Sequence, residues 1–156
     1  MIHDESNSGC MTIFIVLTLV ILPMLITIFI RMEGEKPTVK TELSTLVLGS
    51  GEEFQINIED HKSGIRQLRV SILQDGLEKT VLEKFFQESG IMKKGQTNSE
   101  SVRIKIEPQE LGLKNGKAMI RILAVDYSWK SWGNGNRTNI EIEITIDKEG
   151  LLPQNS

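Results

Sequence analysis

The longest hydrophobic pattern in the chain is the run Met11–Ile30, which contains no charged residue and no glycine. As a helix rising about 1.5 Å per residue, this run is about 30 Å long, the thickness of a bilayer's hydrocarbon core. Pro23 interrupts one backbone hydrogen bond, which membrane helices tolerate. The pattern predicts a transmembrane helix over 11–30, with a polar tail over 1–10 before it.

The residues that flank this run favour an uncleaved anchor over a cleaved signal peptide. A signal peptide begins with basic residues and ends in a small-residue cleavage site. Here the tail carries Asp4 and Glu5, and the run ends at Ile30 and Arg31 without an A-x-A-like site. The positive-inside rule counts Lys and Arg, and these lie on the C-terminal side, which by itself favours a cytoplasmic domain.

After a polar linker over 31–38, the hydrophobic period changes to two. Alternating apolar and polar residues rich in Ile and Val are typical of half-buried strands. Five segments show the alternation clearly, and 43–48 and 79–86 show it weakly. The clear segments are 54–58, 68–72, 102–106, 118–124 and 140–146.

Glycine-containing turns separate these segments, and Asp75-Gly76 is the clearest hairpin signal because both residue types accept a positive φ. The segment 108–112 begins with Pro and ends with Gly, which predicts a single helical turn. The whole pattern predicts an all-β domain over 39–148, namely a seven-stranded antiparallel Ig-like or fibronectin-like sandwich, with a flexible tail over 149–156. An open barrel is the alternative.

Composition narrows the possible functions. All 18 Lys and Arg follow position 30, and this part of the chain contains a nearly equal number of acidic residues. This balance gives no electrostatic case for nucleic acid. The single cysteine, Cys10, cannot form an internal disulfide, so we expect the domain to depend on its apolar core. No phosphate-binding loop or nucleophile motif is present, so we expect no cofactor, no small-molecule substrate and no catalysis.

Two stretches of the chain resemble a known family. Residues 60–70 read D-x-x-SG-I-R-x-x-R-V and lead to the hairpin at Asp75-Gly76, while residues 112–136 contain GLKNGKA, AVDYSW and WGNGN. Together they are similar to the N-terminal region of M23 (LytM-type) metallopeptidases of delta-proteobacteria. The resemblance implies a membrane anchor followed by a periplasmic Ig-like domain. It therefore implies a location opposite to the one that the positive-inside rule favours.

The zinc-binding motifs of that family, H-x-x-x-D and H-x-H, do not occur in this sequence. Its two histidines, His3 and His61, fit neither pattern. The resemblance therefore covers the anchor and the β-domain, without the peptidase domain. We expect the chain to be non-catalytic by itself.

The first candidate binding site is aromatic. Tyr127, Trp129 and Trp132 lie close together in the sequence. The glycine-rich loop after them, which we expect to be mobile and exposed, contains Asn134 and Asn136. Trp and Tyr combine an apolar face with a polar group, so such a cluster serves as an anchor for a partner or a platform for glycan. The alternative is that the rings close one end of the core.

The second candidate is a metal site. Asp60, Asp126 and Asp147 each follow a predicted strand, and carboxylates that converge at strand ends can bind Ca²⁺. No D-x-D-x-D loop supports this, and aspartates at strand ends commonly turn the chain through their own hydrogen bonds. We therefore expect no metal.

The sequence predicts a single-pass protein of the bacterial inner membrane whose periplasmic β-domain has a structural role or binds a partner. The expected partners are the lipid bilayer and an envelope protein or peptidoglycan. Two alternatives remain. One is the accessory part of a truncated or split M23 cell-wall endopeptidase, and the other is a small subunit of a membrane complex.

Overall fold

The computed structural model describes residues 6–32, 34–43, 47–49, 52–90 and 94–149. The chain forms two compact units, Met1–Glu33 and Gly34–Ser156. The first contains the helix α1, Ser6–Arg31. Within it, Gly9–Ile30 is long and apolar enough to cross a membrane. The helix begins at Ser6, so part of the segment expected to be a polar tail is helical.

The α1 helix has the features expected of a segment in an apolar solvent. Its large hydrophobic side chains are exposed all along its length. Its internal polar side chains are few, and the hydroxyl of Thr18 donates a hydrogen bond of 2.8 Å to the carbonyl oxygen of Phe14. Pro23 lies inside the helix without ending it. A hydroxyl bonded within its own helix needs no water, which suits a hydrocarbon environment.

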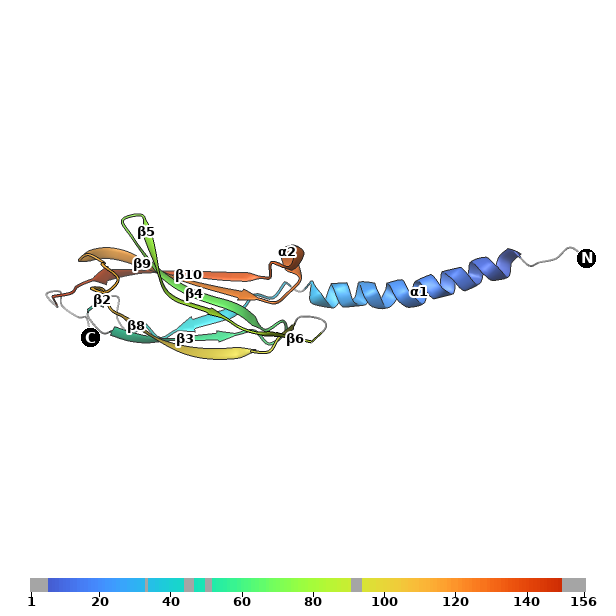
Figure 1. The fold of residues 1–156 in the computed structure, drawn as a ribbon, viewed down its shortest axis with the longest axis horizontal. Coiled ribbons are helices and arrows are strands. Elements are labelled where there is room, and N and C mark those ends of the chain that lie inside the picture. Colours follow the sequence, from blue (N-terminus) through green and yellow to red (C-terminus); the bar gives the residue numbers. More distant parts are fainter. Residues whose placement is uncertain (1–5, 33, 44–46, 50–51, 91–93, 150–156) are drawn as a thin grey trace, which may run out of the picture. The chain divides into compact units, whose positions relative to one another are not determined.

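The second unit, which we call the head, is built from strands in two layers, with one sheet over the other (Figure 1). The first sheet has the order β1 (Thr38–Thr41), β3 (Glu52–Glu59), β8 (Ser99–Ile106). The second has the order β2 (Val47–Leu48), β10 (Arg137–Ile146), β9 (Gly116–Asp126), β4 (Ile65–Gln74), β5 (Leu77–Phe85). A third pair comprises β6 (Glu88–Ser89) and β7 (Lys94–Gly95), and the short helix α2 is Lys130–Gly133.

The prediction of a strand-rich head after an apolar helix is confirmed, but its strand count is wrong. The described residues form sheets of three, five and two strands instead of seven strands in all. The sandwich is also not wholly antiparallel, because β2 pairs with β10 in parallel register. The β1 strand begins at Thr38, inside the expected linker. Its short polar sequence TVKT has too little alternation to be recognised without its partner β3.

The core lies between the two sheets and confirms the period-two reading. In β3, β4 and β9 the side chains expected to face inward are buried, and most of those between them are more exposed; Ser71 of β4 is an exception and is also buried. Ile56, Ile58, Ile120 and Ile122 are among the side chains with no accessible surface. Each such side chain contributes about 1.5–3 kcal/mol by leaving water, so this layer holds the head together in the absence of a disulfide.

The predicted hairpin is confirmed. Asp75 and Gly76 both have positive φ, at 52° and 77°, and they join Gln74 to Leu77 in a two-residue connection. Positive φ at both positions is the geometry that matches the twist of paired strands. The segment 108–112 is a turn with one helical bond, from the Leu111 amide to the Glu107 carbonyl, and it is too short to count as a helix.

The head has two distinct ends. The chain enters it at one end, where the Asn136 amide donates to the Glu35 carbonyl at 2.7 Å and the Thr138 hydroxyl donates to the Pro37 carbonyl at 2.5 Å. We call this the basal end. At the far end lie the β4–β5 turn and the register pair Gly116 and Ile146. At about 3.4 Å per residue, β9 separates the two ends by about 30 Å.

Candidate binding surfaces at the two ends of the head

Asp126 organises the basal end. It ends β9 with no accessible surface, and its carboxylate accepts four hydrogen bonds. The donors are the backbone amide and hydroxyl of Ser128, at 2.9 and 2.7 Å, and the backbone and side-chain amides of Asn136, at 2.6 and 2.9 Å. A buried carboxylate is stable only with such partners. Asp126 therefore ties the ends of the β9–β10 connection together.

The helix α2 lies on the surface of the basal end, in the connection whose two ends are hydrogen-bonded to Asp126. Trp132 is fully exposed and has a φ of 60°, a left-handed conformation that side chains other than glycine rarely adopt. Gly133 follows with a φ of 85°. Trp129, one turn earlier, is partly exposed. The backbone therefore directs the larger of the two exposed indole surfaces away from the core.

Tyr127 lies between the core and these rings. Its hydroxyl donates to the Phe86 carbonyl at 2.6 Å, and the Arg66 guanidinium lies 6.0 Å from its ring centroid. Burial raises the pKa of the Tyr127 phenol, the charge of Glu88 adds to this, and Arg66 opposes it. Tyr127, Trp129 and Arg66 line part of an open hollow of about 420 Å³. The phenol is therefore held as a neutral donor with a structural contact.

The DxxSG segment, residues 60–64, forms a hydrogen-bonded turn at the basal end. One oxygen of Asp60 accepts the backbone amides of Lys62, Ser63 and Gly64 at 3.1, 2.8 and 2.9 Å. This turn brings Gly64, with a φ of 79°, against Gly95, where an added Cβ would lie 2.8 Å from the Gly95 Cα. Two backbones meet at a distance that only glycine permits. The motif residues therefore build the loop.

The structure gives no support to a calcium site made by the three aspartates. Asp60 and Asp126 lie at the basal end, whereas Asp147 follows β10 at the far end, because β9 and β10 are antiparallel. No group of three or more His, Cys, Asp or Glu residues within the described ranges could hold a metal ion. The Asp126 carboxylate instead accepts amide and hydroxyl bonds, and Asp147 Oδ1 accepts the Glu149 amide at 3.3 Å.

Of the predicted aromatic residues, Tyr127 and Trp129 line the same hollow at the basal end. Trp132 is fully exposed on α2, and Asn134 is exposed in the loop that follows. Asn136 was expected in an exposed loop, but it is buried with 4% of its surface accessible. Its side chain bonds to Asp126, Ser128 and the Glu35 carbonyl. The Asn side chain has two N–H donors and two acceptor lone pairs, and this network provides partners for its donors inside the head. The spacing of residues in the sequence does not reveal such partners.

Two exposed hydrophobic side chains on β5 were not predicted from the sequence. Phe85, at the basal end, and Leu77, at the far end, are each 67% exposed. Phe85 pairs with Gln67, which pairs with Val125, so Phe85 lies at the same end of the sheet as α2. The weak alternation of this edge strand was the only available signal.

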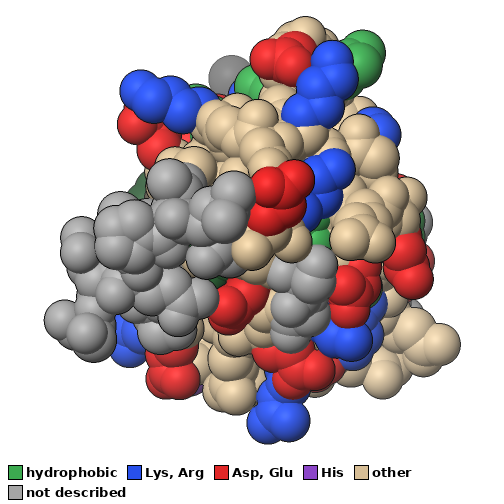
Figure 2. Space-filling view, turned by 90° about the vertical axis from the view of Figure 1, so that its left-hand side faces the viewer, with side chains coloured by type: hydrophobic (Ala, Val, Ile, Leu, Met, Phe, Trp, Pro, Cys, Tyr) green, Lys and Arg blue, Asp and Glu red, His purple; other side chains and the backbone are tan. Residues whose placement is uncertain are grey.

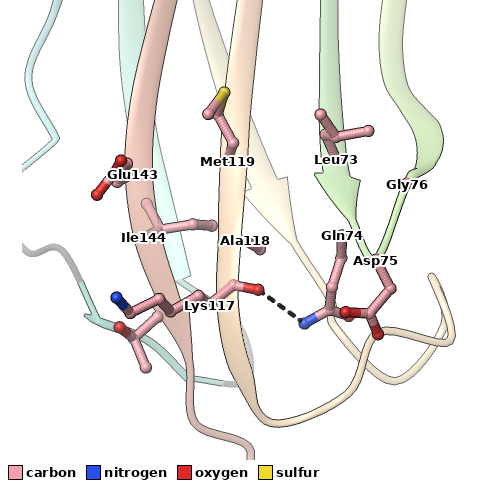
Figure 3. A pocket seen from close by; sticks show the side chains of 10 residues that line it. Leu73, Gln74, Asp75, Gly76, Lys117, Ala118, Met119, Glu143 and Ile144 are labelled. Atoms are coloured by element: carbon pink, nitrogen blue, oxygen red, sulfur yellow. Dashed lines mark hydrogen bonds between the residues drawn. The ribbon is translucent and has the colours of Figure 1, made fainter.

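The far end carries a shallow hollow of about 450 Å³ between the β4–β5 turn and the adjoining ends of β9 and β10. Leu73, Ala118, Met119 and Ile144 supply its apolar lining (Figure 3). Gln74 spans one side, and its side-chain amide donates to the Lys117 carbonyl at 3.4 Å. Seen from this end, the described surface shows scattered charged side chains among backbone and other side chains, with little hydrophobic surface (Figure 2).

Comparison with known proteins leaves the family of this chain open. No protein-family model matches it, and no curated protein matches it. Among solved structures, it is similar to a cellulose-active polysaccharide monooxygenase from M. thermophila at 14% identity and a TM-score of 0.47, over 69% of this chain and 56% of that one. It is also similar to a β-glucosidase from Listeria innocua at 11% identity and a TM-score of 0.42, over 71% of this chain and 16% of that one. The chain thus spans well under two thirds of both proteins.

A third similar structure is AggA, the major subunit of aggregative adherence fimbriae type I from Escherichia coli. Its identity is 13% and its TM-score 0.40, over 71% of this chain and 94% of that one. These neighbours are distant and differ from one another in activity. We therefore draw nothing about function from them.

Proposed function

We propose that this protein is a single-pass membrane protein whose Ig-like head is a non-catalytic module that holds a partner-binding surface above the bilayer. The observation that carries the proposal is that the two ends of the head differ. The chain arrives from the apolar helix at the basal end, and the apolar hollow beside exposed Leu77 lies at the far end. A rigid sandwich between them acts as a spacer of about 30 Å.

The internal chemistry of the head agrees with a structural role. Asp60 and Asp126 are buried, and both carboxylates accept hydrogen bonds from nearby amides. The two stacked sheets of three and five strands agree with the sandwich architecture that we propose for the head. A rigid, well-bonded head suits presentation of a surface.

The partner we propose is an envelope protein or peptidoglycan, and photocrosslinking tests where it binds. A benzoylphenylalanine replaces Leu77 in the full-length protein in its native membrane, and a matched variant carries it at Arg103, which is exposed on β8. We expect a discrete adduct from position 77 and none from position 103. Equal labelling at both positions, or no adduct at 77, would contradict a binding surface at the far end.

Peptidoglycan is tested separately by sedimentation of purified sacculi with the detergent-solubilised full-length protein. If the far end binds the wall, Met119→Asp should reduce cosedimentation, because it places a charge in the apolar hollow. Arg103→Gln, which changes a charge on the exposed side of β8 away from the hollow, serves as the control. Sedimentation that is the same for all three proteins would remove peptidoglycan as the far-end partner.

We place the head outside the cytoplasm, in the bacterial inner membrane, because of the resemblance to the M23 N-terminal region. C-terminal fusions to alkaline phosphatase and to a fluorescent protein test this. Active phosphatase with a dark fluorescent protein is expected, and the reverse result would place the head in the cytoplasm. The kinship with M23 enzymes stays a prediction, and a downstream reading frame with H-x-x-x-D and H-x-H motifs would support the split-enzyme alternative.

A further inference from the structure

The exposed aromatic side chains of the head are unevenly distributed. Among its described residues, four large hydrophobic side chains are exposed: Leu77, Phe85, Trp129 and Trp132. Leu77 alone lies at the far end, and the three aromatic residues lie at the basal end. We call Phe85, Trp129 and Trp132 the aromatic base. Exposed rings gathered at one end of a polar domain mark a surface that meets something partly apolar.

The aromatic base lies close to the point where the chain enters the head. Gly34 is the first residue of this unit, and a Cβ added to it would lie 3.5 Å from the Lys130 ammonium at the start of α2. The Asn136 side chain, just after α2, donates to the Glu35 carbonyl. The segment that carries the two tryptophans is therefore bonded to the first residues of the head.

The length of chain before the head limits how far this point can be from a membrane. The helix α1 ends at Arg31, and three residue steps lead to Gly34, a reach of at most about 11 Å. The headgroup layer on each side of the hydrocarbon core is about 5–8 Å thick. This limit follows from the residue count alone, so it holds for any orientation of the head.

We propose that the aromatic base lies in the phospholipid headgroup layer of the membrane that α1 spans. The inference rests on the proposed membrane anchoring. Trp is enriched at this layer because its ring is apolar while its N–H can still bond to water or headgroups. Trp132 has a left-handed backbone, and its whole indole is exposed to solvent. The ligand is thus the lipid surface.

The chain supplies its own probe for a test. Its only two tryptophans are Trp129 and Trp132, so the tryptophan fluorescence of the full-length protein reports on the aromatic base alone. The protein is reconstituted into phosphatidylcholine vesicles that contain lipids with a nitroxide on the headgroup, near the top of the acyl chain, or near its end. Nitroxide lipids in both leaflets make the measurement independent of which way the head faces.

We expect strong loss of fluorescence with headgroup and upper-chain nitroxides, and little loss with the deepest one. Trp129→Phe, which leaves Trp132 as the only indole, should be quenched more than Trp132→Phe, because Trp132 is the more exposed ring. The matched control adds Leu77→Trp to Trp129→Phe/Trp132→Phe, which moves the probe to an exposed position at the far end. Its fluorescence should not respond to any labelled lipid.

Flotation of the same vesicles distinguishes failure of the proposed membrane anchoring from failure of the proposed lipid contact. A protein that does not float with lipid contradicts the proposed anchoring itself. A protein that floats, but whose native tryptophans are quenched no more than the Leu77→Trp control, overturns the aromatic base as a lipid contact. Fluorescence that ignores nitroxide lipids but responds to added peptidoglycan would assign the rings to glycan instead, and would overturn it equally.

Discussion

The hydrogen bonds of Asp126 make a quantitative prediction about the stability of the head. Asp126→Ala removes all four bonds that its buried carboxylate accepts. A net contribution of about 1 kcal/mol for each bond gives a loss of about 4 kcal/mol. The Ser128 hydroxyl, which lies 3.0–3.1 Å from both Asn136 nitrogens, can keep accepting from them. The buried Ser128 amide loses its acceptor, so about 4 kcal/mol is a lower bound.

The isosteric change Asp126→Asn separates shape from hydrogen bonding. The new amide can keep an oxygen at the Oδ1 position, which serves Ser128 and the Asn136 backbone, but it places an NH₂ against the Asn136 side-chain amide, which is also a donor. One bond is lost and two donors face each other, at a cost of about 1–3 kcal/mol. The expected order of stability is native, then Asp126→Asn, then Asp126→Ala.

Thermal unfolding of the full-length protein in mild detergent measures this order. Tryptophan fluorescence reports directly on the basal end, because both tryptophans lie there. For a domain of this size, 4 kcal/mol lowers the midpoint by roughly 15–20 °C. Glu143→Ala, which removes an exposed carboxylate from β10, should change stability by less than about 0.5 kcal/mol. Asp126→Ala within 1 kcal/mol of native would refute the assignment of Asp126 as the organiser of the basal end.

Three further predictions use matched pairs. Gly64→Ala should lower the unfolding free energy, measured by chemical denaturation, by about 2–4 kcal/mol, because its Cβ would meet Gly95 at 2.8 Å. Gly76→Ala, with a similar φ but open space around it, should lower it by only about 1 kcal/mol. Equal losses would refute the close approach. Trp132→Gly should raise the unfolding free energy by about 1 kcal/mol through relief of its left-handed backbone, and Trp132→Ala should not, so a matching gain from alanine would contradict the strain. The Arg69 hydrogen bond lowers the pKa of Glu83 below its ordinary 4.5, so this pair stabilises the head above pH 4.5 and loses its effect as the pH falls through the lowered value. In Arg69→Gln, the Glu83 pKa measured by NMR should return toward 4.5, and an unchanged pKa would rule out the pair as the cause.

Some residues of the candidate binding surfaces could be predicted from the sequence, and others could not. Tyr127, Trp129 and Trp132 could be identified because large aromatic residues are scarce in the chain and these three are adjacent in the sequence. Phe85 could not, since it lies on an edge strand whose alternation is weak. Asn136 was placed in solvent because its neighbours are glycines, yet its main partners lie 10 and 101 residues away in the chain. Contacts at such separations leave no local pattern.

The sequence by itself determined the parts of this protein that repeat along the chain. The apolar run sets the helix, and period-two burial sets the longer strands β3, β4, β8, β9 and β10, because each pattern is local and recurs many times. Glycine with aspartate sets the β4–β5 turn for the same reason. These features need no knowledge of which segments meet.

Only the tertiary structure decided which segments meet and what each end of the head carries. The parallel contact of β2 with β10 and the separation of Asp147 from the other two aspartates follow from strand direction, which alternation does not encode. The same holds for the aromatic base, in which Phe85 of β5 lies at the same end of the head as the tryptophan segment near Gly34. The hydrophobic or polar character of each residue is a local property that the sequence shows directly. Which segments pack against each other depends on the whole folded chain.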